Sequence, residues 1–477
     1  MNRIIDFFKV SEPSAKKVAP EKAEKYYKKL RFQAFVAATI GYSLYYVCRT
    51  SLNVVKSPII DSGMLSATQL GTIGLCLFWA YAIGKFVNGF FADYANITRF
   101  MATGLVVSAF VNLMLGLTNI LTVSAGIANA TIFVVFAIMW GMNGWAQSMG
   151  APPAIISLSR WYPLSIRGTF YGFFSASHNF GEFLSFLFVG VLVSAFGWQW
   201  GFYGAAVAGA LGVVLVLFWL HDTPESKGLA PIEVLSKEKT MEEYEAAQFS
   251  KDEDKEIQEA RKKETNRIQR AVLRNPGVWI LALASAFMYM SRYAINSWGI
   301  TFLEKVKGFT TLEASTIISV NAICGVAGTV LSGWMSDSLF HGDRKYPAFV
   351  AGVLEALSLI LFLFGGNSWF INILAMVLFG IAIGVLICFL GGLMAVDIVP
   401  RKATGAALGV VGMASYAAAG IQDVISGILI DNMATKDIAT GEIIQYDFTY
   451  VSWFWIASAV ISFLLPILNW RRKQANI

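Results

Sequence analysis

Two arginines stand in the same short pattern at two distant places in the chain. The pattern Tyr-x-x-Arg-x-x-x-Asn contains Arg49 at its first occurrence and Arg292 at its second, an offset of 292 − 49 = 243 residues. A guanidinium keeps its charge at physiological pH, and its planar fork donates two parallel hydrogen bonds to phosphate oxygens. Each arginine lies in an apolar segment, where a charge is costly unless a partner or ligand stabilises it. We therefore predict that the two arginines hold one phosphate group; the alternative is that each neutralises a neighbouring carboxylate.

Further ionisable residues lie in apolar segments of the same kind. Lys85 follows Tyr81 by one helical turn and is predicted to add a third cation to the phosphate site, unless its head reaches the membrane surface instead. His178, in the polar run Ser-Ala-Ser-His-Asn, is predicted to support phosphate binding, and a hydrogen bond between helices is the alternative. Glu355 lies in a segment of this kind as well, and we assign it no role.

Two carboxylates accompany these cations. Glu182 is four residues beyond His178, so the two side chains share a helical face and are expected to form a hydrogen-bonded pair. A carboxylate beside a phosphate must bind sugar hydroxyls, pair with a cation or carry a proton. The sequence leaves all three options open. Our prediction for contacts to the organic part of a solute comprises Glu182, Asp423, Tyr42, Tyr46, Tyr81, Gln147, Tyr289, Asn296 and Tyr416.

A second repeated pattern follows the second apolar segment of each half. Gly89-x-x-x-Asp93 recurs as Gly333-x-x-x-Asp337, an offset of 333 − 89 = 244 residues. A glycine permits close approach of two membrane helices, and a carboxylate can cap or latch the end of a neighbouring helix. We predict that these four residues take part in gating.

The composition indicates the elements that position these residues. The 477 residues are 56% hydrophobic and 14% charged, with a mean hydropathy of +0.58, which is typical of a membrane protein. Twelve apolar stretches are long enough for a membrane crossing of about 20 helical residues. The predicted fold is all-α, with twelve transmembrane helices in two pseudo-symmetric six-helix bundles. The predicted spans are 33–55, 68–92, 99–119, 125–150, 168–195, 199–220, 277–303, 313–336, 346–366, 369–396, 404–430 and 448–470.

The predicted organisation places both termini in the cytoplasm, because lysine and arginine gather in the loops on the side of the N-terminus. The first 31 residues contain several lysines and no apolar core, so no signal peptide is expected. Two halves of one orientation predict a solute site between them near the bilayer midplane. The regions are an N-terminal segment 1–32, a bundle 33–220, a cytoplasmic linker 221–274, a bundle 275–470 and a tail 471–477.

Several classes of function are not expected. The net charge of +6 is explained by loop topology and anionic lipid, so no nucleic-acid partner is predicted. The four cysteines show no metal-ligand spacing, and neither a metal nor a cofactor is predicted. The sequence contains no pattern of nucleophile and base, and no glycine-rich phosphate loop, that predicts an enzyme. A monomer in the lipid bilayer is expected.

Several motifs resemble the organophosphate:phosphate antiporter family of the major facilitator superfamily, from about residue 41 to residue 470. The resemblance implies the major facilitator fold and a bacterial inner membrane. It also implies exchange of glycerol-3-phosphate, hexose-6-phosphates or phosphoglycerates for inorganic phosphate, with both arginines on the phosphate and the histidine in support. The motifs are Gly41-Tyr42-x-x-Tyr45-Tyr46-x-x-Arg49, Gln147-x-x-Gly150-x-Pro152-Pro153, Ser177-His178-Asn179-x-Gly181, Tyr289-x-x-Arg292-Tyr293 and Gly328-Thr329-x-x-x-Gly333-Trp334-x-Ser336-Asp337.

The chain departs from this family at positions that bear on the substrate. Thr50 stands where bacterial members commonly carry a lysine, and Leu408 and Val411 replace an Asp and a Lys of the hexose-phosphate carriers. Glu182 replaces a family glycine, and Asp423 is an added acid. Two extra carboxylates suit a polyhydroxylated solute, so we predict a hexose-6-phosphate such as glucose-6-phosphate. A glycerol-3-phosphate or phosphoglycerate antiporter, and a transporter-like membrane sensor of external sugar phosphate, are the alternatives.

Overall fold

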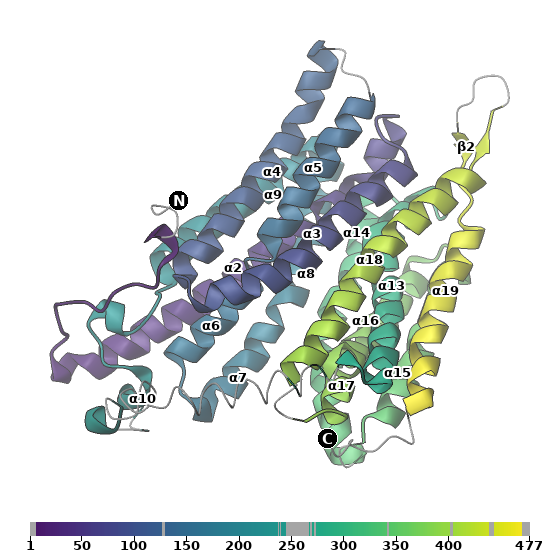
Figure 1. Cartoon of the computed structure of the whole chain (residues 1–477). Coiled ribbons are helices and arrows are strands. Elements are labelled where there is room, and N and C mark those ends of the chain that lie inside the picture. Colours follow the sequence, from purple (N-terminus) through teal and green to yellow (C-terminus); the bar gives the residue numbers. More distant parts are fainter. Residues whose placement is uncertain are drawn as a thin grey trace.

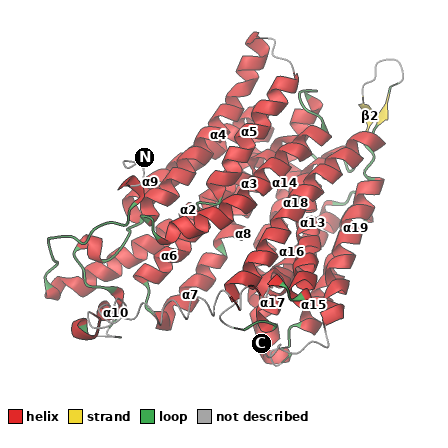
Figure 2. Cartoon of the chain, in the orientation of Figure 1, coloured by secondary structure: helices red, strands yellow, loops and turns green. Residues whose placement is uncertain are grey.

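The computed structural model of the chain describes residues 6–125, 129–236, 238, 240–244, 267, 270, 273–340, 343–400, 404–437 and 443–469. Most of the predicted linker 221–274 and all of the predicted tail 471–477 lie outside these residues, so the boundaries of the five predicted regions stay predictions. Helices make up nearly all of the described chain, and one short hairpin adds the strands (Figure 2).

The first half is a bundle of helices that runs from purple through blue to teal in Figure 1. Its first helix begins earlier than the predicted span, because Pro20 fits the first turn of a helix, where the missing N–H costs nothing. The helices are α2 (Pro20–Asp61), α3 (Ala67–Asp93), α4 (Ile97–Ala125), α5 (Asn129–Gln147), α6 (Ala151–Trp161), α7 (Leu164–Ser175), α8 (Ser177–Phe196) and α9 (Trp198–Trp219).

The second half, green to yellow in Figure 1, lies beside the first. After η1 (Glu225–Lys227) and α10 (Ile232–Leu235), its helices are α13 (Pro276–Lys305), α14 (Thr311–Trp334), α15 (Lys345–Phe364), α16 (Trp369–Cys388), α17 (Met394–Asp397), α18 (Thr404–Met433) and α19 (Thr449–Leu464). Short π-helical turns, η2 (Met335–Leu339) and η3 (Phe389–Leu393), follow α14 and α16, and a 3-10 turn, η5 (Leu465–Asn469), follows α19. The strands β1 (Thr435–Lys436) and β2 (Ile443–Gln445) pair antiparallel.

The pseudo-symmetry of the halves extends to the caps of their second helices. Ser66 and Gln69 form a capping box at the start of α3, and Thr310 and Glu313 form one at the start of α14. The offset of 310 − 66 = 244 residues equals that between Gly89 and Gly333. Each box satisfies two backbone N–H groups that the first turn leaves free, so both helices begin at equivalent positions.

Within the described residues, eleven helical segments are long and apolar enough to cross a membrane. The twelfth is α2, which packs along α8 and α9 and carries the buried Arg49 and Lys56. Three of the crossings are interrupted: α5 continues into α6, α7 into α8, and α16 into α17. The prediction of an all-α protein with twelve spans is thus confirmed, although single spans such as 168–195 consist of two helices.

The outer surface of the bundle is apolar, as a lipid-facing surface must be. On α9 the side chains of Val207, Leu211, Val214 and Phe218 are all more than half exposed. Their spacing of three to four residues places them on one face of the helix, while small residues such as Gly209 pack on the other. The hydrophobic face of α9 therefore points out of the protein.

The two halves meet tightly at the end of the bundle where β2 lies, which we call the hairpin end (Figure 1). The contacting pairs are α3 with α18, α8 with α14 and α2 with α13. A Cβ on Gly71 of α3 would lie 2.3 Å from the backbone oxygen of Asp423, and one on Gly427 of α18 would lie 2.3 Å from that of Ala67. Only glycine permits such backbone contact.

At the opposite end, where α10 lies and which we call the linker end, the same helices stand apart. A Cβ on Gly89 of α3, Gly172 of α7, Gly333 of α14 or Gly409 of α18 would find no atom within 4 Å. Aromatic side chains of these helices, such as Phe173, are exposed there. The halves are therefore closed at the hairpin end and parted at the linker end.

Candidate functional site

Arg49 is buried among aromatic rings between the halves. Its side chain, 4% exposed, comes from the middle of α2, with the guanidinium carbon 4.3 Å from the ring centre of Tyr81. In the described part of the chain no carboxylate lies within 4 Å of it. Its Nη2 donates a long hydrogen bond of 3.5 Å to the hydroxyl of Tyr293. The cation is held by ring faces and a hydroxyl, which leaves its charge uncompensated. Three more rings face it: Tyr46 at 5.4 Å, Phe78 at 5.7 Å and Tyr416 at 5.3 Å.

Arg292 is equally buried but has an acidic partner. Its Nη2 donates to Glu182 Oε2 at 3.0 Å, and Asn296, one turn later on α13, donates to Glu182 Oε1 at 2.7 Å. Both carboxylate oxygens are therefore bonded, and Glu182 is only 1% exposed. Since Glu182 belongs to α8 and Arg292 to α13, this ion pair joins the two halves. Glu182 does not form the expected pair with His178.

The two arginines meet at one tyrosine. Arg49 donates to the hydroxyl of Tyr293, while the guanidinium carbon of Arg292 lies 5.3 Å from the centre of the same ring. Tyr293 directly follows Arg292 on α13, and the long arginine side chain brings its guanidinium to the neighbouring ring. The structure thus brings the two predicted arginines to a single place between the halves.

Tyr416 of α18 is the centre of the surrounding aromatic cluster. Its ring lies 4.6 Å from that of Tyr81, 5.4 Å from that of Tyr289 and 6.4 Å from that of Tyr293. The Nζ of Lys85, one turn beyond Tyr81 on α3, lies 5.3 Å from the Tyr416 ring centre. Lys85 is exposed, and no carboxylate of the described residues lies within 4 Å of it. Lys85 and Arg49 therefore face the same ring.

His178 lies where α7 gives way to α8, at the second residue of α8. Its ring is 5.9 Å from that of Tyr46, which in turn packs edge-on against Tyr42 at 5.5 Å. The histidine is half-buried and borders the cluster around Arg49. The break in the helix therefore positions a titratable ring next to the predicted phosphate site.

Gln147 lies elsewhere. Its amide donates to Ser108 Oγ at 3.1 Å and to Asn143 Oδ1 at 3.4 Å, and Asn143 donates to the carbonyl of Cys48 at 3.1 Å. These bonds tie α5 to α4 and α2 within the first half. The structure therefore places Gln147 in the polar packing of one bundle and does not bring it to the two arginines.

Asp423 pairs with a cation that the sequence analysis missed. The Nζ of Lys56 lies 2.7 Å from Asp423 Oδ1, and Ser297 donates to the same oxygen at 2.7 Å. Both charged side chains are at most 1% exposed, and Trp298 covers the ammonium at 4.0 Å. Lys56 falls one residue beyond the predicted span 33–55, so it was not counted as buried. Its spacing of seven residues, two helical turns, from Arg49 is the signal that would have found it.

The two glycines among the predicted gating residues are not packed against a neighbouring helix. Gly89 and Gly333 have open space around them, and Asp93 is exposed at the end of α3. The side chain of Asp337 lies outside the described residues. Close helix contact occurs instead at the hairpin end. A role of these four residues in gating stays a prediction that applies to the linker end.

Two ion pairs and one hydrogen bond to a carboxylate cross between the halves near the hairpin end. Lys56 meets Asp423, Asp61 meets Lys305, and Asp431 accepts from the backbone N–H of Thr68 at 2.6 Å, at the start of α3. The last contact places a carboxylate at the positive end of a helix dipole. Each contact joins one residue of the first half to one of the second. Opening the hairpin end therefore requires breaking all three.

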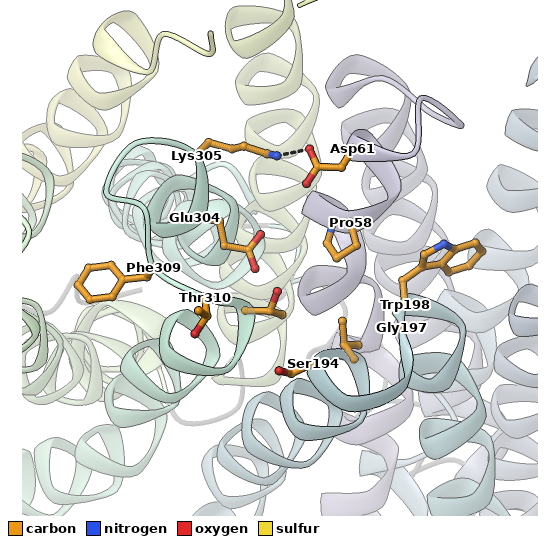
Figure 3. Close-up of a pocket in the computed structure, with 11 residues that line it drawn as sticks. Pro58, Asp61, Ser194, Gly197, Trp198, Glu304, Lys305, Phe309 and Thr310 are labelled. Atoms are coloured by element: carbon orange, nitrogen blue, oxygen red, sulfur yellow. Dashed lines mark hydrogen bonds and ion pairs between the residues drawn. The ribbon is translucent and has the colours of Figure 1, made fainter. Parts of the chain in front are cut away.

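A pocket of about 520 Å³ lies beside these contacts, between the ends of α2, α8 and α13. Figure 3 shows Asp61 and Lys305 reaching toward each other across it, with Glu304 and Pro58 below them. Neither Arg49 nor Arg292 lines this pocket. It belongs to the closed end of the interface and is separate from the arginine cluster.

The sequence is similar to several known membrane proteins. The profile of the Major Facilitator Superfamily matches residues 38–422. The chain is 33% identical over 405 residues to the probable hexose phosphate transport protein of Chlamydia muridarum, covering 83% of this chain and 84% of that protein. It is 32% identical over 437 residues to the glycerol-3-phosphate transporter of Bacillus subtilis, covering 90% and 92%. The membrane sensor protein UhpC of Salmonella typhimurium is 29% identical over 406 residues, covering 83% and 84%.

The fold is also similar to solved structures. A bacterial homolog of the human lysosomal transporter Spinster, in an inward-facing and unoccupied conformation, superposes with a TM-score of 0.68 over 94% of this chain and all of that chain. The sequence identity is 18%, so this likeness concerns the fold alone.

Proposed function

Because this chain belongs to the organophosphate:phosphate antiporter family of the Major Facilitator Superfamily, we propose that it exchanges an organic phosphate for inorganic phosphate by alternating access. The chain is a multi-pass membrane transporter and no enzyme. We place it in a bacterial inner membrane, as a monomer with cytoplasmic termini and no cofactor. A hexose-6-phosphate such as glucose-6-phosphate is the favoured substrate, and glycerol-3-phosphate and phosphoglycerate are the alternatives.

One observation carries this proposal: a buried arginine without an acid partner in the described chain, next to a second free cation. Arg49 and Lys85 face the same Tyr416 ring, and Arg292 meets Arg49 at Tyr293. A buried charge without a counter-ion is costly, and a bound phosphate supplies that counter-ion. Arg49 offers a fork of N–H donors, and Lys85 adds a point charge.

Exchange follows from the same electrostatics. Arg49 and Lys85 repel each other when the halves close around them and exclude water, because the Coulomb energy grows as the local dielectric constant falls. A dianion bound between Arg49 and Lys85 attracts both cations and outweighs their repulsion. In our proposal the carrier therefore changes its open side readily with a phosphate bound, whether organic or inorganic, and slowly without one.

Reorientation requires the closed end to open and the open end to close. The contacts of Asp61, Asp423 and Asp431 across the halves must separate at the hairpin end. The uncovered glycines at the linker end, among them Gly89 and Gly333, then come together. In our proposal the phosphate, held by residues of both halves, provides the binding energy that favours this closure.

The organic part of the substrate has tyrosines as its nearest partners. The carboxylates of Glu182 and Asp423 are occupied by Arg292 and Lys56, so in this conformation neither presents a free oxygen to a sugar hydroxyl. Aromatic rings offer apolar faces to a sugar ring and hydroxyl groups to its oxygens. We propose that the organic moiety contacts Tyr42, Tyr46, Tyr81, Tyr289 and Tyr416.

The test is transport by the purified protein in liposomes. Liposomes loaded with inorganic phosphate should take up labelled phosphate, and external glucose-6-phosphate should inhibit this uptake more strongly than glycerol-3-phosphate or 3-phosphoglycerate. Liposomes loaded with sulfate should take up much less. If none of the three organic phosphates inhibits uptake, the chain is not an organophosphate exchanger.

A sensor of external sugar phosphate is the second candidate, because a membrane sensor protein is among the similar sequences. A sensor needs to bind its ligand but not to move it. Tight binding of glucose-6-phosphate to the purified protein, together with no uptake into phosphate-loaded liposomes, would favour the sensor.

A further inference from the structure

The charges around the arginines can be counted residue by residue. Three cations, Arg49, Arg292 and Lys85, contact the shared tyrosines Tyr293 and Tyr416. One anion, Glu182, contacts one of them. The sum is 3 − 1 = +2. Lys56 and Asp423, at the hairpin end, neutralise each other and add 1 − 1 = 0 to this sum.

Glu182 contributes a full negative charge to this sum. Its two oxygens accept hydrogen bonds from a guanidinium and an amide, and both of these groups are donors in this arrangement. Hydrogen bonds donated to both oxygens of a carboxylate stabilise its ionised form. The neighbouring side chains Tyr46 of α2, Tyr293 of α13 and His178 of α8 add no further carboxylate to this cluster.

A charge of +2 balances a dianion. Phosphate monoesters lose their second proton near pH 6, so at pH 8 glucose-6-phosphate, glycerol-3-phosphate and inorganic phosphate each carry about −2. 3-Phosphoglycerate carries a carboxylate as well and reaches about −3. A third negative charge would have no free cation in the described site and would lie near the carboxylate of Glu182, and buried uncompensated charge is costly.

We propose that Glu182 determines the charge of the accepted substrate: by cancelling one of three cations, it makes the site select phosphate monoesters with an uncharged organic part. The proposal rests on the proposed transport function and narrows its substrate class. The hydrogen bond from Asn296 holds the Glu182 carboxylate next to Arg292. In this position Glu182 sets the net charge of the site and is therefore a specificity-determining residue. Solutes that carry a phosphate and a carboxylate are rejected by this site.

The test removes the negative charge of residue 182 and keeps the size of its side chain. In Glu182→Gln the sum becomes +3, and an amide of the same size can still accept from Arg292. Inhibition of labelled phosphate uptake at pH 8 is measured with 3-phosphoglycerate and with glucose-6-phosphate, and the ratio of their half-inhibitory concentrations is compared with that of the wild type. We expect this ratio to shift in favour of 3-phosphoglycerate by about tenfold, the effect of one added charge partly screened by water.

Two controls separate charge from structure. Glu182→Asp keeps the charge and should keep the wild-type ratio. Glu355→Gln makes the same substitution at another buried acidic residue, in α15, which has no cation within 4 Å in the described chain, and should leave the ratio unchanged. If Glu182→Gln binds but does not transport, calorimetric titration of the purified protein with the two solutes gives the same ratio.

The inference is overturned if Glu182→Gln keeps the wild-type ratio, or if Glu182→Asp or Glu355→Gln shifts it as much. It is also overturned if the wild type accepts 3-phosphoglycerate as readily as glucose-6-phosphate. These outcomes all presuppose inhibition of phosphate uptake by organic phosphates. Loss of all such inhibition in the wild type would instead refute the proposed function.

Discussion

Arg49 and Arg292 occupy equivalent places in two halves of related sequence, but their surroundings differ. Arg49 lies among rings with no carboxylate of the described chain within 4 Å, whereas Arg292 is bonded to Glu182. In the described chain Arg49 donates one long hydrogen bond, to the hydroxyl of Tyr293, and none to an acid, whereas part of the donor set of Arg292 is occupied by Glu182. The comparison shows that the repeated motif determines the position of each arginine along its helix. The neighbouring helices determine whether its charge is neutralised by a carboxylate or available to a substrate.

A third buried cation extends the comparison, because Lys56 has a complete partner in Asp423. Asp423→Asn would leave this lysine buried and uncompensated, which costs about 3–5 kcal/mol. We expect a large fall in the midpoint of thermal unfolding of the purified protein. The double variant Lys56→Met, Asp423→Asn removes both charges and should recover most of this loss. An unchanged midpoint in the single variant would show that Lys56 does not depend on its partner.

The next largest effect is expected at Arg49, the arginine that has no acidic partner in the described chain. Arg49→Lys keeps a positive charge but loses the planar guanidinium, which donates two parallel hydrogen bonds to phosphate oxygens. A lysine ammonium cannot reproduce this geometry, so phosphate should bind more weakly. Phosphate exchange should fall about hundredfold, or about 2.7 kcal/mol. The amount of protein in the membrane, measured by immunoblot, should not change. Near-normal exchange in this variant would refute the phosphate site.

A smaller loss is expected for Arg292→Lys. Since Glu182 already accepts from Arg292, fewer of its donors are free for the substrate, and a lysine can still pair with the carboxylate. Exchange should fall about tenfold, or about 1.4 kcal/mol. The measurement is the initial rate of labelled phosphate uptake beside that of Arg49→Lys. Equal losses in the two variants would show that the difference in their surroundings has no functional consequence.

The smallest effect is expected at the tyrosine that both arginines contact. Tyr293→Phe removes the hydroxyl that accepts from Arg49 at 3.5 Å and keeps the ring that faces Arg292. A bond of this length contributes little, so the half-saturating phosphate concentration should change by about twofold. A tenfold change would mean that the hydroxyl itself binds substrate, which would make Tyr293 part of the phosphate site.

Much of the candidate site is foreseen by pattern. The repeat of Tyr-x-x-Arg-x-x-x-Asn singles out both arginines, and hydropathy gives the twelve spans, because these signals are local in sequence. Lys56 escapes because a span boundary drawn from hydropathy ends one residue too early. The break between α7 and α8 escapes as well: it lies in the polar run Ser-Ala-Ser-His-Asn, but the whole segment Ser165–Phe196 is apolar enough to be taken as a single span.

The sequence by itself determined that this protein spans the membrane in two related halves, and it singled out the charged residues inside them with the exception of Lys56. Only the tertiary structure decided the pairing of those charges. Glu182 and His178 are neighbours on one helix, yet Glu182 bonds to Arg292 across the interface, because packing of α8 between α2 and α14 turns its carboxylate toward α13. The physical reason is distance: an ion pair depends on a few ångströms between helices, and residues 110 positions apart share no local pattern that records it.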